Sequence, residues 1–139
     1  QITDSQQGGR MSPSELRYLI ASNELAEGDR AVRQKDVADR LRVSKVSAYN
    51  AIERLKEKGL LEKNERCVVL TEVGKNVLGE YMTIIGFISV HLSKHCGTSE
   101  KRAYEDALNA VCGFSDETRI GVARFIESGM NGIHHGFGV

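Results

Sequence analysis

Two histidines and two cysteines are the residues of this sequence best suited to hold a metal ion. His91 and His95 are four residues apart, a spacing that places both on one face of a helix, as in many zinc sites. Cys96 follows directly, and Cys112 lies on the next predicted helix. One interpretation is a divalent transition metal held by His91, His95 and Cys112 or Cys96. The other is that the histidines continue an apolar stripe as packed or interfacial side chains, and that the single cysteines are buried small hydrophobes.

Positive charge is concentrated in one segment, although the total is balanced. The 139 residues carry 19 Lys+Arg and 19 Asp+Glu, yet eleven of the basic and only six of the acidic residues lie between Arg30 and Arg66. This window has a net charge of +5, and the rest of the chain has −5. A local basic face suits nucleic-acid phosphates, whereas the neutral total excludes a uniformly basic coat or a polybasic membrane tail. The alternative is a solvated helix surface with i,i+4 ion pairs.

The basic window is predicted to fold as helix, turn, helix and hairpin. Ser44 is a good N-cap for the second helix, and Gly59 is its stop. That helix carries an apolar stripe of Val46, Ala48, Ile52 and Leu55. The elements expected here are helices over residues 34–41 and 45–58, a turn at 42–44, and strands over 60–62 and 67–71 separated by a polar turn at 63–66.

The chain as a whole is predicted to be mainly α with a small β-hairpin wing. It reads as a winged helix-turn-helix domain followed by a helical dimerisation domain. Four further helices are expected, over residues 12–25, 72–95, 99–112 and 116–128. The expected organisation is a leader at 1–10, a DNA-binding domain at 11–74, a dimerisation domain at 75–128, and an irregular Gly-rich tail at 129–139.

A helix-turn-helix with a wing predicts binding to double-stranded DNA. The major groove admits one helix, here residues 45–58, while the wing reaches the backbone or the minor groove. Asn50 suits an adenine edge, Ser47 a base or a phosphate, and Tyr49 a phosphate or the thymine methyl group. The full set of expected DNA contacts is Arg33, Ser44, Lys45, Ser47, Tyr49, Asn50, Arg54, Lys63 and Arg66.

These features together resemble a known family. The helix-turn-helix is common to many regulators, but the pattern Leu70-Thr71-x-x-Gly74-Lys75 at the exit of the wing is more specific. One long helix, a break at Gly97 and the helix start Ser115-Asp116-Glu117 follow it. This succession resembles the metal-dependent repressors typified by the diphtheria toxin repressor and the manganese transport regulator. The resemblance implies a homodimer formed through the helical second half. The members that the chain resembles are the shorter ones, which lack an SH3-like domain.

The resemblance also implies a metal site, but the residues at its positions are poor ligands. The family senses divalent metal with carboxylate, imidazole and sulfur donors. Mn²⁺ and Fe²⁺ prefer oxygen and imidazole donors. Of the residues at the family's metal positions, only Cys112 would bind a transition metal well. We hypothesise that packing of the apolar residues, worth about 6–10 kcal/mol, holds the first helix against the helical second half and so replaces the metal. The family positions fall here on Arg17, Ile20, Ile85, Ser89, Tyr104, Leu108, Val111 and Cys112.

The sequence therefore predicts a transcriptional regulator, expected to be a repressor, that binds a palindromic operator as a homodimer. Alternatives are a regulator that senses a small molecule or a relocated metal, and a winged-helix protein-interaction module. No catalytic set or phosphate loop appears at useful spacing, so an enzyme is not expected. The absence of a signal peptide or apolar span predicts a cytoplasmic protein without membrane contact.

Overall fold

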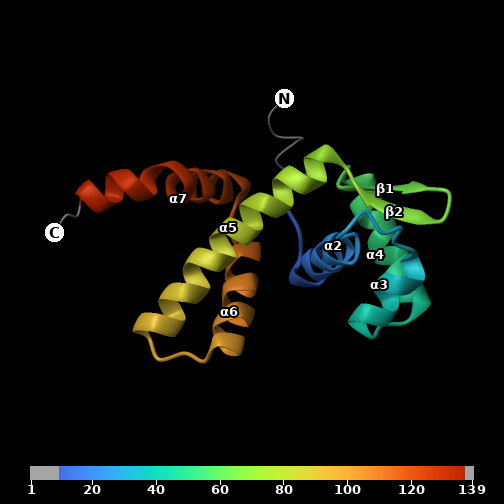
Figure 1. Ribbon diagram of the computed structural model, residues 1–139, viewed down its shortest axis with the longest axis horizontal. Helices are drawn as coiled ribbons and strands as arrows, with labels where there is room; N and C mark the ends of the chain where they lie inside the picture. Colours follow the sequence, from blue (N-terminus) through green and yellow to red (C-terminus); the bar gives the residue numbers. More distant parts are fainter. Residues whose placement is uncertain (1–9, 137–139) are drawn as a thin grey trace. The chain divides into compact units, whose positions relative to one another are not determined.

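The computed structural model describes the backbone of residues 10–136 and the side chains of residues 10–129. Helices and a single hairpin make up the described part, in the order α2, α3, α4, β1, β2, α5, α6, α7 (Figure 1). The chain forms two compact units that divide between Leu78 and Gly79, inside α5. The predicted mainly α fold with a hairpin wing is confirmed. Of the helices described, none is both long enough and apolar enough to cross a membrane.

Three short helices build the first unit. They are α2 (Pro13–Leu25), α3 (Gln34–Leu41) and α4 (Lys45–Glu57), and each packs against the other two. Ser12 begins α2 with a capping box, in which its hydroxyl accepts from the Glu15 amide and the Glu15 carboxylate accepts from the Ser12 amide. Between α3 and α4 the chain turns sharply because Arg42 adopts a left-handed conformation, with φ of 57°. This is the expected helix-turn-helix.

The hairpin follows directly on α4. Strand β1 (Leu61–Asn64) pairs antiparallel with β2 (Cys67–Leu70), in a register that sets Leu61 opposite Leu70 and Asn64 opposite Cys67. The predicted four-residue turn is wrong, because Lys63 and Asn64 continue the ladder and leave only a two-residue turn. A bridge between Arg33 and Cys67 adds the segment before α3 to the free edge of β2.

The wing-exit pattern has a direct physical explanation. The Thr71 hydroxyl donates to the Gly59 carbonyl at 2.6 Å and accepts from the Gly74 amide at 2.9 Å. It therefore joins the residue that follows the C-cap of α4 to the first turn of α5. A Cβ on Gly74 would lie 2.1 Å from the Leu60 carbonyl oxygen. Helix α5 (Glu72–His95) can begin at this point only because residue 74 has no side chain.

The second unit contains the rest of α5 together with α6 (Glu100–Cys112) and α7 (Asp116–Gly136). Its buried apolar residues are Tyr81, Ile84, Ile85, Ala103, Ala107, Leu108, Val111 and Ala123. Arg119 of α7 is almost fully buried among them, with 2% of its side chain exposed. Its guanidinium pairs with Asp116 at 2.7 Å and with Glu80 of α5 at 3.2 Å, so the buried charge is compensated.

Two further expectations are corrected by the structure. Val46 does not belong to the buried stripe of α4, since it is 68% exposed and Ala51 is buried instead. Successive residues of an α-helix are about 100° apart, so Val46 lies about 200° around the axis from the buried Ala48. Residues 129–136 are not an irregular tail but the last part of α7, because glycine lowers helix propensity without forbidding helix. The remainder of that tail, 137–139, and leader residues 1–9 lie outside the described residues.

Candidate nucleic-acid interface

The N-terminal end of α4 is an exposed polar surface. Lys45, Ser47, Tyr49 and Asn50 are all exposed, whereas Ala48 between them is fully buried. The helix therefore presents four side chains able to bind nucleic acid while its other face is fixed in the core. Tyr49 keeps 48% of its surface exposed, so its ring and hydroxyl are accessible to a partner.

Ser44 and Ser47 are tied to each other at the start of this helix. The Ser44 hydroxyl accepts from the Ser47 amide at 3.0 Å and donates to the Ser47 hydroxyl at 3.0 Å. Ser44 therefore acts as the cap that positions the helix, as the sequence predicts. Lys45 beside it has no ion-pair partner among the residues described.

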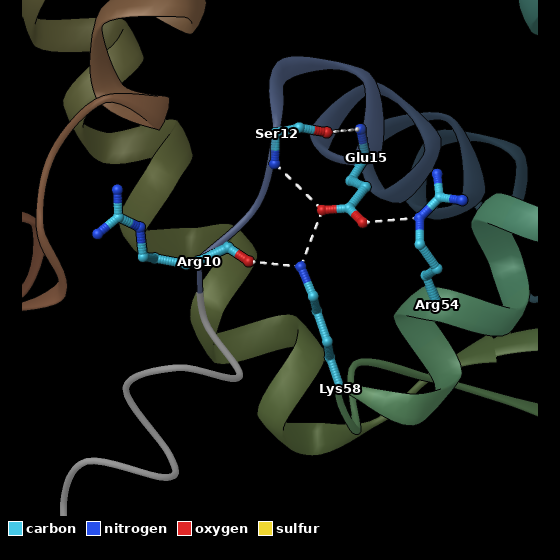
Figure 2. Close-up of polar contacts among 5 residues, drawn as sticks. All are labelled: Arg10, Ser12, Glu15, Arg54 and Lys58. Carbon is cyan, nitrogen blue, oxygen red and sulfur yellow. Dashed lines mark hydrogen bonds and ion pairs between the residues drawn. The ribbon is translucent and has the colours of Figure 1, made fainter.

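Cations at the C-terminal end of α4 form ion pairs with a carboxylate from α2. Glu15 is 8% exposed at its side chain, and it accepts from Lys58 Nζ at 2.8 Å and from Arg54 Nε at 3.0 Å. Figure 2 shows both cations converging on this one carboxylate from α4, while the Ser12 amide approaches from its own helix. Lys58 donates as well to the Arg10 carbonyl oxygen at 2.7 Å.

The balance of forces on Glu15 favours its ionised form. Burial opposes ionisation, but hydrogen bonds from Lys58, from the Ser12 amide and from Arg54 outweigh it, and the pKa of Glu15 is lowered from its ordinary value of 4.5. The cluster is therefore charged at neutral pH, and Arg54 and Lys58 share one internal counter-ion.

A second carboxylate ties the wing to α4. Lys63 of β1 lies 3.1 Å from Glu53 Oε2, and its ammonium sits 4.8 Å from the centre of the Tyr49 ring. Lys56 pairs with the same carboxylate at 3.5 Å. The hydrogen bond from Lys63 is the main cause of a lowered pKa for Glu53. Lys63 therefore contacts residues of the helix that the sequence predicts to enter the groove.

The other predicted contacts are exposed and lack such partners. Arg33 stands immediately before α3, where its amide donates to Asp36, and its side chain is exposed. Arg66 is exposed in the two-residue turn of the wing. Within the described part of the chain, six cations of the basic window have no carboxylate partner, and they are Arg30, Arg33, Lys35, Arg42, Lys45 and Arg66.

The residues at the family's metal positions do not fit a Mn²⁺ or Fe²⁺ site. Ile85, Leu108 and Val111 are buried in the apolar core of the second unit, and the Ser89 hydroxyl donates to the Gly86 carbonyl of its own helix. The other four positions hold Arg17, Ile20, Tyr104 and Cys112, each partly exposed. The five apolar or cationic side chains at these positions offer a hard divalent ion nothing to bind, and Ser89, Tyr104 and Cys112 supply no carboxylate or imidazole donor.

His91 and His95 are exposed, not packed in the core of the second unit. Their rings stack at 5.4 Å between centroids, and Phe87 lies 4.5 Å from His91, so the three rings form a column along α5. Among the described residues, no three His, Cys, Asp or Glu side chains lie close enough to hold a metal ion. A metal bound by His91, His95 and Cys112 stays a prediction.

Comparison with solved structures gives the fold a counterpart. The chain has the fold of the manganese regulator SloR. The two align with a TM-score of 0.67 and 23% identity, over 84% of this chain and 55% of SloR. A similar match to ScaR with bound Zn²⁺ has a TM-score of 0.63 and 22% identity, over 81% of this chain and 53% of ScaR. The expected resemblance to metal-dependent repressors is thereby confirmed at the level of the fold.

A third match concerns a chain of comparable length. The hypothetical protein SSo2273 from Sulfolobus solfataricus aligns with a TM-score of 0.66 and 20% identity, over 84% of this chain and 89% of that one. The chain thus spans about half the length of SloR and ScaR and most of SSo2273. No family model matches the sequence, and neither does any curated protein.

Sequence reasoning missed Glu15 and Arg119. The pattern Ser12-x-x-Glu15 predicts a capping box, but the partners Arg54 and Lys58 are 39 and 43 residues away in the chain. Arg119 stands in an Asp-Glu-Thr-Arg run that looks like an exposed helix start. Its burial depends on Glu80, 39 residues earlier, and no local pattern contains that information.

Proposed function

We propose that this protein is a DNA-binding transcriptional regulator that places α4 in the major groove of double-stranded DNA. The observation that carries the proposal is the division of α4 into two faces. Ala48, Ala51, Ile52 and Leu55 fix one face in the core, and the opposite face presents uncommitted polar and cationic groups at its N-terminal end. A helix held in this way can enter a groove without losing its packing.

The roles of the side chains follow from their chemistry. Asn50 has both a donor and an acceptor, so it suits the bidentate edge of adenine. Lys45 and Arg66 suit phosphates, Ser47 suits a base or a phosphate, and Tyr49 offers a ring and a hydroxyl.

We further propose that the regulator acts as a homodimer on a palindromic operator, with the second unit forming the dimer. SloR is a manganese regulator, and a regulator built on the same fold is the simplest function for this chain. The metal positions described above argue that its DNA binding does not depend on Mn²⁺ or Fe²⁺. The buried apolar side chains of Ile85, Leu108 and Val111 stabilise the second unit without an ion.

Selection from a random duplex library, with and without divalent metals, tests this proposal. We expect enrichment of an inverted repeat whose recovery is the same in both arms. Recovery of no sequence in either arm would contradict the proposal, and enrichment only with metal would contradict its metal independence. A metal at His91 and His95 is the second candidate, suggested by their i,i+4 spacing and exposure on α5, and metal analysis of untagged protein tests it.

A further inference from the structure

The cations of the basic window fall into two groups that the sequence does not separate. One group contacts an internal carboxylate, and the other has no carboxylate partner in the described residues. Four members of the first group lie at the C-terminal end of α4 and on β1, and they are Arg54, Lys56, Lys58 and Lys63; the fifth, Arg40 near the end of α3, pairs with Glu24. The second group includes Arg33 and Lys35 at the start of α3, Arg42 and Lys45 at the turn into α4, and Arg66 in the wing turn.

Two carboxylates hold four of the five paired cations, two cations each. Glu15 takes Lys58 and the Nε edge of Arg54, and Glu53 takes Lys56 and Lys63. The Glu15 carboxylate is held more firmly in place than that of Glu53, because Glu15 is buried and fixed by its own capping box. A cation that already lies within 3.5 Å of a carboxylate must lose or share that ion pair before it can neutralise a phosphate.

We infer that Glu15 and Glu53 confine the phosphate contacts of this protein to the N-terminal ends of α3 and α4 and to the wing turn. Arg54 and Lys63 then act as positioning residues. Arg54 joins α4 to α2, and Lys63 holds the wing and the Tyr49 ring against α4. This inference rests on the proposed function and refines it, because it removes two of the nine predicted DNA contacts from direct contact with DNA.

The salt dependence of DNA binding separates the two kinds of cation. The logarithm of the binding constant falls with the logarithm of the salt concentration by about 0.9 for each phosphate neutralised. We would measure this slope with the full chain and one fixed duplex, either the selected operator or, if none is found, a 30-base-pair random duplex. The variants are Lys45→Gln, Arg54→Gln and Lys63→Gln.

The expected result is a slope lower by about 0.9 per protomer for Lys45→Gln and little changed for Arg54→Gln and Lys63→Gln. Affinity itself is expected to fall for Lys63→Gln, because the wing and Tyr49 lose their anchor. A drop of about 0.9 in the slope for Arg54→Gln or Lys63→Gln would overturn the inference.

Releasing the sequestered cations gives the converse test. Glu15→Gln removes the counter-ion of Arg54 and Lys58 at nearly constant volume, and we expect a steeper slope by up to about 0.9 per released cation. Glu57→Gln is the matched control, because Glu57 is the last residue of α4, is exposed and has no ion pair in the described part of the chain. It makes the same charge change without releasing a cation.

Equal slopes for Glu15→Gln and Glu57→Gln would overturn the inference. Thermal unfolding of each variant shows whether it is folded, and the Arg54 and Lys63 variants decide the matter if Glu15→Gln is not. Absence of any salt-dependent binding by the unsubstituted protein is a different result, because it contradicts the proposed function itself.

Discussion

Lys58 Nζ lies 2.8 Å from Glu15 Oε1, although the two residues are 43 positions apart in the chain. The contact joins the first turn of α2 to the C-cap of α4, so the capping carboxylate of α2 pairs with the cation that caps α4. One buried ionised group thus helps to fix the position of α4 relative to α2. This role makes stability sensitive to acid.

Stability is expected to fall at acid pH through Glu15. The pKa of this carboxyl is below 4.5 in the folded protein and near 4.5 in the unfolded chain. Its stabilising contribution is therefore complete above the unfolded value and is lost as pH falls through the lower, folded value. Glu15→Gln should cost about 1–3 kcal/mol at neutral pH and flatten the acid limb. Urea unfolding from pH 3 to 7 measures both, with Glu57→Gln as control, and an unchanged acid limb in Glu15→Gln would contradict the assignment.

Gly74→Ala is expected to destabilise the protein by about 1–3 kcal/mol, because the new methyl group would overlap the Leu60 carbonyl. Gly79→Ala makes the same change five residues further along α5, where a Cβ would meet no atom within 4 Å. That control should gain up to about 1 kcal/mol from helix propensity. Denaturant unfolding compares the two, and equal effects would mean that α5 does not approach Leu60 so closely.

Arg119→Met is expected to destabilise the second unit by about 3–5 kcal/mol. The substitution leaves Asp116 and Glu80 without their shared cation beside an apolar core. Raised salt should not rescue it, because the pair is buried. Arg124→Met on the same helix is the control, since Arg124 is exposed, and its effect should stay within about 0.5 kcal/mol. Calorimetry of both variants checks the difference, and similar melting temperatures would refute it.

Lys45 and Asn50 are expected to affect DNA binding in different ways. Lys45→Gln should weaken binding to all duplexes by a similar factor, because phosphate contacts carry no sequence information. Asn50→Ala should reduce discrimination at one base pair by about 1–3 kcal/mol and leave non-specific binding nearly unchanged. Titration of each variant against the operator and its single-base variants measures both quantities. Equal losses on every duplex for Asn50→Ala would exclude base readout by this residue.

Removal of metal is expected to leave DNA affinity unchanged. The family's metal positions hold Ile20, Ile85, Leu108 and Val111, which cannot coordinate an ion. Binding titrations in excess chelator and in Mn²⁺ or Zn²⁺ should therefore give the same dissociation constant. Loss of binding in chelator, restored by one of these ions, would contradict this and would direct attention to His91 and His95.

Much of the fold follows from the sequence because its signals are local. The capping residues Ser12, Ser44 and Ser99 and the left-handed glycines Gly59 and Gly97 mark helix ends within a few residues. Errors arose where a local signal was weak. The wing turn is shorter than its polar run, and α7 continues through glycines that lower helix propensity without preventing helix.

The sequence by itself determined the order of elements, the site of the basic segment and the poor ligands at the family's metal positions, since each depends on residue type and short spacing. Only the tertiary structure decided which cations are committed. Arg54 and Lys45 look alike on one predicted helix, yet Arg54 pairs with the carboxylate of Glu15, whereas Lys45 has no carboxylate partner in the part of the chain that the structure describes. Ion pairing depends on distances of a few ångströms between segments about 40 residues apart, and such distances exist only once α2, α4 and the wing have packed together.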